Sequence, residues 1–269
     1  MLNKVTLKYT ATNWVLQLTT TLILSSVMMV VPTIAYSNDI YLNQIGDNLN
    51  LSITQDGEDN SIGTYSTPTS LDGDNIDVTI TQETEGASVN LSVDGNNTTL
   101  VAKQKCHNGS LCNADNMDLD ITGIGNSMEL GQGYKITAND WLYDNVEHGG
   151  HNMELSVNGN DNNIKLSQRS QNSISDHNMD VDITGDDNNV HVMQEANQDK
   201  TLNLTINNDD NNVFVHQKKA FSHTATISLD GTYGTDLSLT QSSTTSAQSY
   251  SLTQDCQTVG GCSVSVTQN

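Results

Sequence analysis

Apolar residues alternate with polar ones in short runs along most of the chain. One unit places Met153, Leu155 and Val157 at every second position, and a second run with Ile164 and Leu166 follows. Strict alternation over five or six residues is typical of a half-buried β-strand, and no helical 3.6-residue period competes with it. Glycine, asparagine and aspartate separate the two runs, which is turn chemistry. The pattern therefore predicts a strand, a tight turn and a second strand.

This unit, which we call a rung, recurs along the chain with a glutamine at the end of its second strand. Successive glutamines are 22 to 36 residues apart: Gln55, Gln82, Gln104, Gln132, Gln168, Gln194, Gln217, Gln241 and Gln268. In six rungs a glycine stands nine residues before the glutamine, at Gly46, Gly73, Gly95, Gly123, Gly159 and Gly185, and a seventh rung has Asn208 there. Asparagine, like glycine, tolerates a positive φ, so these positions are predicted turns.

A single rung cannot bury its apolar face, so the rungs must stack. We therefore expect an all-β fold: a two-sheet β-solenoid of about nine strand-turn-strand rungs over residues 38–269, with parallel in-register stacking. Glutamine shares the parity of the buried residues, and a column of its amides can hydrogen-bond along the stack. The first run (Ile40, Leu42, Gln44) and the last (Val264, Val266, Gln268) keep the pattern.

Residues 1–37 differ from the rest and have the layout of a secretory signal peptide. Lys4 and Lys8 precede an apolar stretch from Trp14 to Val31, and Ala35 and Ser37 are small residues suited to cleavage. A retained membrane anchor is the alternative. Removal of this segment would leave 8 Lys+Arg against 32 Asp+Glu, a net charge of −24, and no other segment of membrane-spanning length. We expect a secreted, extracellular or cell-surface protein.

Composition excludes several classes of function. Aromatic residues are only 4% of the chain, too few to fill an ordinary thick core. A formal charge of −22 argues against nucleic acid or an anionic membrane as partner, because both repel a polyanion. No nucleophile–base arrangement, phosphate loop or carboxylate pair stands out from the repeats, so we expect no enzymatic activity.

The repeat resembles the curlin repeat of bacterial curli fibre subunits over roughly residues 39–269. The motif Gly-x2-Asn-x-apolar-x3-Gln stands here as Gly123/Asn126/Met128/Gln132, as Gly159/Asn162/Ile164/Gln168 and as Gly185/Asn188/Val190/Gln194. The resemblance implies a secreted subunit that forms amyloid fibres for adhesion or biofilm matrix. It also implies that its partners are further copies of itself, a nucleator subunit and an outer-membrane secretion channel. Whether the chain is a major or a minor subunit stays open.

Four cysteines form two identically spaced pairs, Cys106-x5-Cys112 and Cys256-x5-Cys262. In a secreted protein such pairs favour two local disulfides. A metal site built on Cys106, His107 and Cys112 is the alternative, although no fourth ligand has a fitting spacing.

Other candidate chemistry is explained by the repeat itself. His148 and His151 could form a metal pair, yet His151 and His177 both open the sequence His-Asn-Met, so repeat ancestry accounts for His151. The Asp- and Asn-rich turns are consistent with solvation or with weak calcium binding, and no tightly bound cofactor is expected. Residues 133–150 form an insertion with Tyr134, Trp141 and Tyr143, either a contact surface or a cover for the side of the rod.

Two hypotheses of function follow. The first is a structural subunit that assembles head-to-tail into curli-like extracellular amyloid fibres, because stacked rungs leave unpaired strand edges at both ends. The second is a monomeric secreted β-solenoid that acts as an adhesin or as a ligand- or calcium-binding surface module.

Overall fold

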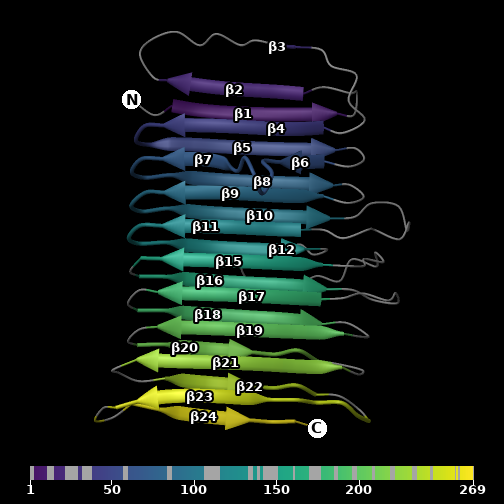
Figure 1. Cartoon of the computed structure of the whole chain (residues 1–269), viewed down its shortest axis with the longest axis vertical. Coiled ribbons are helices and arrows are strands. Elements are labelled where there is room, and N and C mark those ends of the chain that lie inside the picture. The colour runs from purple at the N-terminus through teal and green to yellow at the C-terminus, as the bar shows by residue number, and fades with distance from the viewer. Residues whose placement is uncertain are drawn as a thin grey trace.

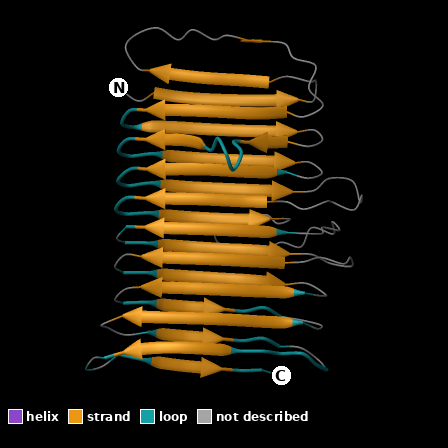
Figure 2. Cartoon of the chain, in the orientation of Figure 1, coloured by secondary structure: helices purple, strands orange, loops and turns teal. Residues whose placement is uncertain are grey.

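The computed structural model of the chain is a rod built from two long, mainly parallel β-sheets that face each other (Figure 1). The structure describes residues 3–10, 15–21, 30–31, 38–56, 60–83, 87–105, 116–132, 136–137, 140–141, 151–159, 161–169, 177–184, 187–195, 199–207, 210–218, 222–231, 235–242, 245–257, 259 and 261–268. These residues contain strands and loops but no helix (Figure 2). The described part of the chain therefore has no helix that could cross a membrane.

The first sheet contains the second strand of every rung. Its strands, in spatial order, are β1 (Asn3–Thr10), β5 (Leu49–Asp56), β8 (Asp77–Glu83), β10 (Thr99–Lys105), β12 (Ser127–Gln132), β16 (Asn163–Arg169), β18 (Asn189–Glu195), β20 (Asn212–Val215), β22 (Asp236–Leu239) and β24 (Ser263–Val266). Each pairs in parallel with its neighbours.

The second sheet contains the first strand of every rung. In chain order its strands are β2 (Val15–Thr21), β3 (Val30–Val31), β4 (Asn38–Ile45), β6 (Asn60–Ile62), β7 (Thr69–Asp72), β9 (Ser88–Asp94), β11 (Asn116–Thr122), β15 (Asn152–Asn158), β17 (His177–Thr184), β19 (Lys200–Asn207), β21 (His223–Gly231) and β23 (Ser251–Cys256). From β4/β5 to β23/β24 the described strands make nine rungs, as the spacing of the glutamines predicts.

Inward residues of both sheets close on one thin aliphatic core. Leu100 stacks between Val78 and Met128, and in the facing sheet Leu119 stacks between Leu91 and Leu155. These six side chains are at most 2% exposed, because the pleat sends every second residue to the same face. The period-2 alternation in the sequence is therefore the pattern that the core uses. This all-β solenoid is the predicted fold class.

One rung interrupts its first strand. β6 and β7 both pair with β4, and the chain between them leaves the sheet in a turn closed by backbone hydrogen bonds between Thr64 and Thr67. The turn, visible in Figure 2 as a loop standing off the strands, carries Pro68 and the 91% exposed Tyr65. The alternation pattern alone does not reveal this excursion, since the pairing resumes in register after it.

The two remaining regions add strands outside the nine rungs. In the predicted leader, β1 pairs with β5 and β2 with β4, both in parallel, so that Thr20 is in register with Gln44. The cleavage of residues 1–37 as a signal peptide stays a prediction. In the predicted insertion, β13 (Ile136–Thr137) and β14 (Asp140–Trp141) form a small antiparallel pair. Tyr134 and Tyr143 lie outside the described residues.

Candidate functional site: the ladders and the last rung

The predicted glutamines stand one above another along the rod. Their strands keep Gln55, Gln82, Gln104, Gln132, Gln168 and Gln194 in register, and hydrogen bonds continue the column through Gln217 and Gln241 to Gln268. The eight glutamines from Gln55 to Gln241 are 0% exposed. We call this column the glutamine ladder.

Each ladder amide has two roles. Gln104 Nε2 donates to Gln82 Oε1 at 3.0 Å and also to the backbone oxygen of Asn116 at 3.1 Å. Asn116 opens the next rung, so the second bond connects the end of one rung with the start of the next. Similar bonds to a backbone oxygen of the following strand region are made by Gln82, Gln132, Gln168, Gln217 and Gln241. An amide has the two donors that both bonds require, whereas leucine has none.

The direction of donation reverses inside the ladder. From Gln132 back to Gln55, each Nε2 donates toward the N-terminal rung, at 2.7–3.1 Å. From Gln194 onward each Nε2 donates toward the C-terminal rung, at 2.6–3.2 Å. The reversal falls at Gln168, and the Oε1 atoms of Gln168 and Gln194 accept no hydrogen bond within the described structure. Sequence spacing carries no signal for this polarity.

The predicted turn glycines lie in a column where backbones touch. A Cβ on Gly123 would overlap the carbonyl oxygen of Gly95, and one on Gly95 would overlap that of Gly73. Gly46, Gly73 and Gly123 also have φ of 147°, 149° and 136°, a region that favours glycine. Close approach between rungs is thus an additional reason for glycine that the sequence does not show. Gly185 and Asn208 lie outside the described residues.

The left-handed residue of each turn comes two positions after the glycine. This second column holds Asn48, Asn75, Asn97, Gly125, Asp161, Asp187 and Asp210, with φ between 52° and 72°. The asparagines form a ladder of their own, with Nδ2 of Asn97 donating to Asn75 Oδ1 at 3.2 Å. Asparagine and aspartate are the non-glycine residues that adopt this conformation most readily. The sequence pattern indicates these turns but predicts a positive φ only in the glycine column, whereas the structure has it in both columns.

The asparagines three positions after the turn glycines, or after Asn208, point into the rod. Asn126, Asn162, Asn188 and Asn211 are at most 2% exposed. Asn188 Nδ2 donates to Asn162 Oδ1, and Asn211 Nδ2 donates to Asn188 Oδ1, both at 2.7 Å. Asn126 Nδ2 donates to the backbone oxygen of Gly123 at 2.8 Å, which closes the turn within its own rung.

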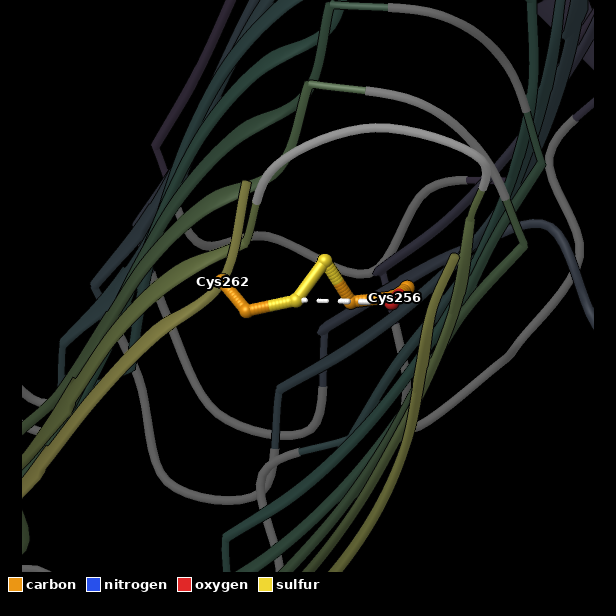
Figure 3. Close-up of a disulfide and its surroundings, with 2 residues drawn as sticks. All are labelled: Cys256 and Cys262. Carbon is orange, nitrogen blue, oxygen red and sulfur yellow. Dashed lines mark hydrogen bonds between the residues drawn. A yellow bond between two sulfur atoms is a disulfide. The ribbon is translucent and has the colours of Figure 1, made fainter. Parts of the chain in front are cut away.

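In the last rung a disulfide takes the place of this turn contact. Cys256 is in register with Gly231, which places it in the glycine column. Cys262 directly precedes Ser263, the first residue of β24, so it stands at the place that the buried asparagines have before the second strand of earlier rungs. Figure 3 shows the two side chains joined across the turn, with a Cα–Cα distance of 6.0 Å. The predicted Cys256–Cys262 disulfide is therefore present and connects β23 to β24. The other predicted pair, Cys106 and Cys112, lies outside the described residues, as does His107.

A buried basic column faces the glutamine side of the rungs. His177, Lys200 and His223 are in register, each 1% exposed, and the ring of His151 stacks on that of His177 with centroids 5.1 Å apart. Burial lowers the pKa of Lys200 to about 8, and burial together with Lys200 lowers that of His223 to about 4. His148, the other half of the predicted metal pair, lies outside the described residues.

The outer surface of the second sheet carries stacked carboxylates. Asp118, Glu154 and Asp180 are in register on adjacent strands. Burial raises the pKa of Asp118 and the charge of Asp120 adds to the rise, while a hydrogen bond from Asn90 opposes it. Within the described residues no group of three His, Cys, Asp or Glu side chains has the geometry to hold a metal ion.

The β23/β24 rung leaves its inward residues uncovered. Val264 is 42% and Val266 40% exposed, whereas Leu237 and Leu239, one rung earlier in the same columns, are 2% and 1% exposed. No further strand of the described chain covers the outer edge of β24. An edge of this kind offers unpaired backbone groups to another chain.

The fold and its ladders define a parallel β-solenoid with amide ladders. No family model matches the chain, and no curated protein or solved structure matches it either. The assignment of function therefore depends on the geometry described above.

Proposed function

We propose that this protein is a structural subunit that assembles head-to-tail into extracellular, curli-like amyloid fibres. The supporting observation is the uncovered β23/β24 rung, where Val264 and Val266 are 42% and 40% exposed at positions that are buried in the rungs before it. Another copy that adds its first rung would cover them and continue both sheets. A heterologous contact of this kind does not close on itself and gives a filament.

The ladders support the same proposal. Gln268 accepts from Gln241 at 3.2 Å, and a further copy would present Gln55 at the next position of that column. Backbone pairing, an amide ladder and aliphatic columns are the interactions of cross-β assemblies. Export through an outer-membrane channel, nucleation by a second subunit and a role in adhesion or biofilm matrix complete the proposal, through the curlin resemblance.

Electron microscopy and fibre diffraction of the secreted chain test the proposal. The expected result is unbranched fibres with a meridional reflection at about 4.8 Å and increased thioflavin fluorescence. Size-exclusion chromatography provides the opposing measurement. A lasting monomer without a cross-β signal would exclude the fibre role and favour a secreted adhesin or binding module.

A further inference from the structure

Two strands of the predicted leader, residues 1–37, cover the first of the nine rungs. β1 pairs with β5 along its whole length, with Asn3–Thr10 in register with Leu49–Asp56. β2 pairs with β4 from Leu16 to Thr21. Both pairings are parallel, and Figure 1 shows the two strands at the N-terminal end of the rod, next to β4 and β5. In the full chain the outer edge of the first rung is therefore covered.

The leader strands lack the features by which one rung stacks on the next. Tyr9 is in register with Gln55, so the glutamine ladder has no glutamine at this level. Residues 1–37 contain no glycine, so they cannot continue the glycine column, in which the turns of successive rungs touch. On the outer side of β2, β3 pairs in the antiparallel sense, whereas all pairings between the nine rungs are parallel. The leader thus covers the first rung without adding another rung of the same kind.

The opposite end of the rod stays open in the same chain. No described strand covers the outer edge of β24, and Val264 and Val266 are 42% and 40% exposed. A chain that retains residues 1–37 therefore has one covered end and one open end. Such a chain can attach its last rung to the first rung of a copy that lacks the leader, but the end that it then presents is covered.

We infer that residues 1–37, until they are removed, act as an intramolecular cap that blocks growth at the first rung, so that their removal permits fibre assembly. This inference rests on the proposed fibre function. An open strand edge is an aggregation hazard, and a covering segment protects it. Two copies that both retain the leader have no open first rung between them. The leader would thereby prevent filaments from forming inside the cell, in addition to its predicted part in export.

Seeded elongation compares the full chain with the processed chain, which is collected after export and whose N-terminus is checked by mass spectrometry. Both are refolded from denaturant and added to seeds of the processed chain. We expect the full chain alone to elongate at least about tenfold more slowly, because a seed accepts one such copy at its first-rung end and none at the other. One full chain mixed with about twenty processed chains should stop growth at that end only, which two-colour imaging of the seeds measures.

Proline variants separate strand pairing from the mere attachment of an apolar segment. Consecutive residues of a strand direct their N–H groups to opposite sides, so a pair of neighbouring prolines removes one donor toward the partner strand. The full chain with Thr6→Pro and Leu7→Pro in β1 and with Leu18→Pro and Thr19→Pro in β2 should elongate within about threefold of the processed chain. The matched control, Leu7→Ile with Leu18→Ile, keeps both strands and should stay blocked.

Hydrogen exchange provides a measurement that needs no fibre. Amides of β5 should exchange at least about tenfold more slowly in the monomeric full chain than in the monomeric processed chain, because β1 pairs with β5 only in the former. Equal exchange, a full chain that elongates like the processed chain, or a proline variant that stays blocked would overturn the cap and leave the fibre role intact. A processed chain that forms no fibre would instead overturn the proposed function, and the inference with it.

Discussion

Lys200 and His223 lie opposite each other on the adjacent parallel strands β19 and β21, and each side chain is only 1% exposed. Two basic side chains at paired positions of adjacent strands inside a thin core cannot both be charged without a large cost in free energy. His223 accordingly has a pKa lowered to about 4, through burial first and the charge of Lys200 second. The same column continues to Gln248, which forms an isolated bridge with His223, so the fold accepts a neutral amide one rung further on.

Stability should therefore fall on acidification, and His223→Gln should reduce that fall. Between pH 6.5 and about 4 the unfolded chain binds a proton at His223 that the folded chain does not, so the free energy of unfolding decreases as the pH falls through this window. The loss assigned to His223 is up to about 3 kcal/mol. Urea unfolding of wild type and variant at pH 7 and pH 4.5 measures it. Lys200 and the neighbouring Asp199 and Glu195 are the charged groups that act on this column, and all three remain in both proteins. Equal pH dependence in the two proteins would contradict the assignment.

Gln104→Leu should destabilise the monomer more than a typical surface substitution. The change removes the donor to Gln82 Oε1 and to the backbone oxygen of Asn116, and the acceptor of Gln132 Nε2. Buried polar atoms that lose their partners cost about 1–3 kcal/mol each, so we expect a loss of about 2–5 kcal/mol in urea unfolding. Gln257→Leu removes an exposed amide that donates to the exposed Asp255, so it is the control and should change stability by less than about 0.5 kcal/mol. Similar effects of the two changes would show that the ladder contributes little.

Two neighbouring glycines should respond in opposite ways. Gly123→Ala forces a Cβ against the carbonyl oxygen of Gly95 at a φ of 136°, and we expect a loss of at least about 2 kcal/mol. Gly125→Asn should be neutral or stabilising, because Gly125 has a φ of 72° in a column where the adjacent rungs carry Asn97 and Asp161. Thermal unfolding of both variants gives the comparison. A mild effect at Gly123 would argue against close contact between the turns.

Reduction of the Cys256–Cys262 disulfide should loosen the last rung without unfolding the rod. The bond closes a loop of six-residue separation, and a ring of that size contributes about 2–3 kcal/mol. Hydrogen exchange should accelerate in β23 and β24 and stay unchanged in β15 and β17. Cys256→Ser with Cys262→Ser provides the same test without a reductant. If the proposed fibre grows from this rung, seeded elongation should slow together with the loss of protection.

Fibre assembly should be faster at higher ionic strength. The chain without residues 1–37 carries a net charge of −24, and stacked carboxylates such as Asp118, Glu154 and Asp180 repeat along one face. Raising the salt concentration from 10 mM to 150 mM shortens the Debye length from about 30 Å to about 8 Å, so repulsion between subunits weakens. Thioflavin kinetics at both concentrations measure the lag time. Calcium chloride and sodium chloride at equal ionic strength separate specific calcium binding from screening, and a lag time indifferent to salt would remove the electrostatic barrier from the proposal.

Much of the site could be predicted because each rung repeats one local pattern. The parity of Gln104 with Leu100 in the alternation places the amide inside, and the constant nine-residue interval between turn glycine and glutamine places it next to Gln132 in the stack. The excursion at Tyr65 could not be predicted in this way, because its residues leave the sheet and the alternation resumes in register afterwards. The basic column is not evident from the sequence either, because His177 and Lys200 precede the alternating apolar run of their rungs and differ in residue type.

The sequence by itself determined the two-residue period, the rung length and the residues that face the core, because alternation in a strand has only two faces and one of them must be apolar. Only the tertiary structure decided which groups meet between rungs. The direction of the glutamine ladder at Gln168 and the contact of Gly123 with Gly95 both depend on stacking across 22 to 36 residues of chain, and local composition carries no record of which atoms that stacking brings together.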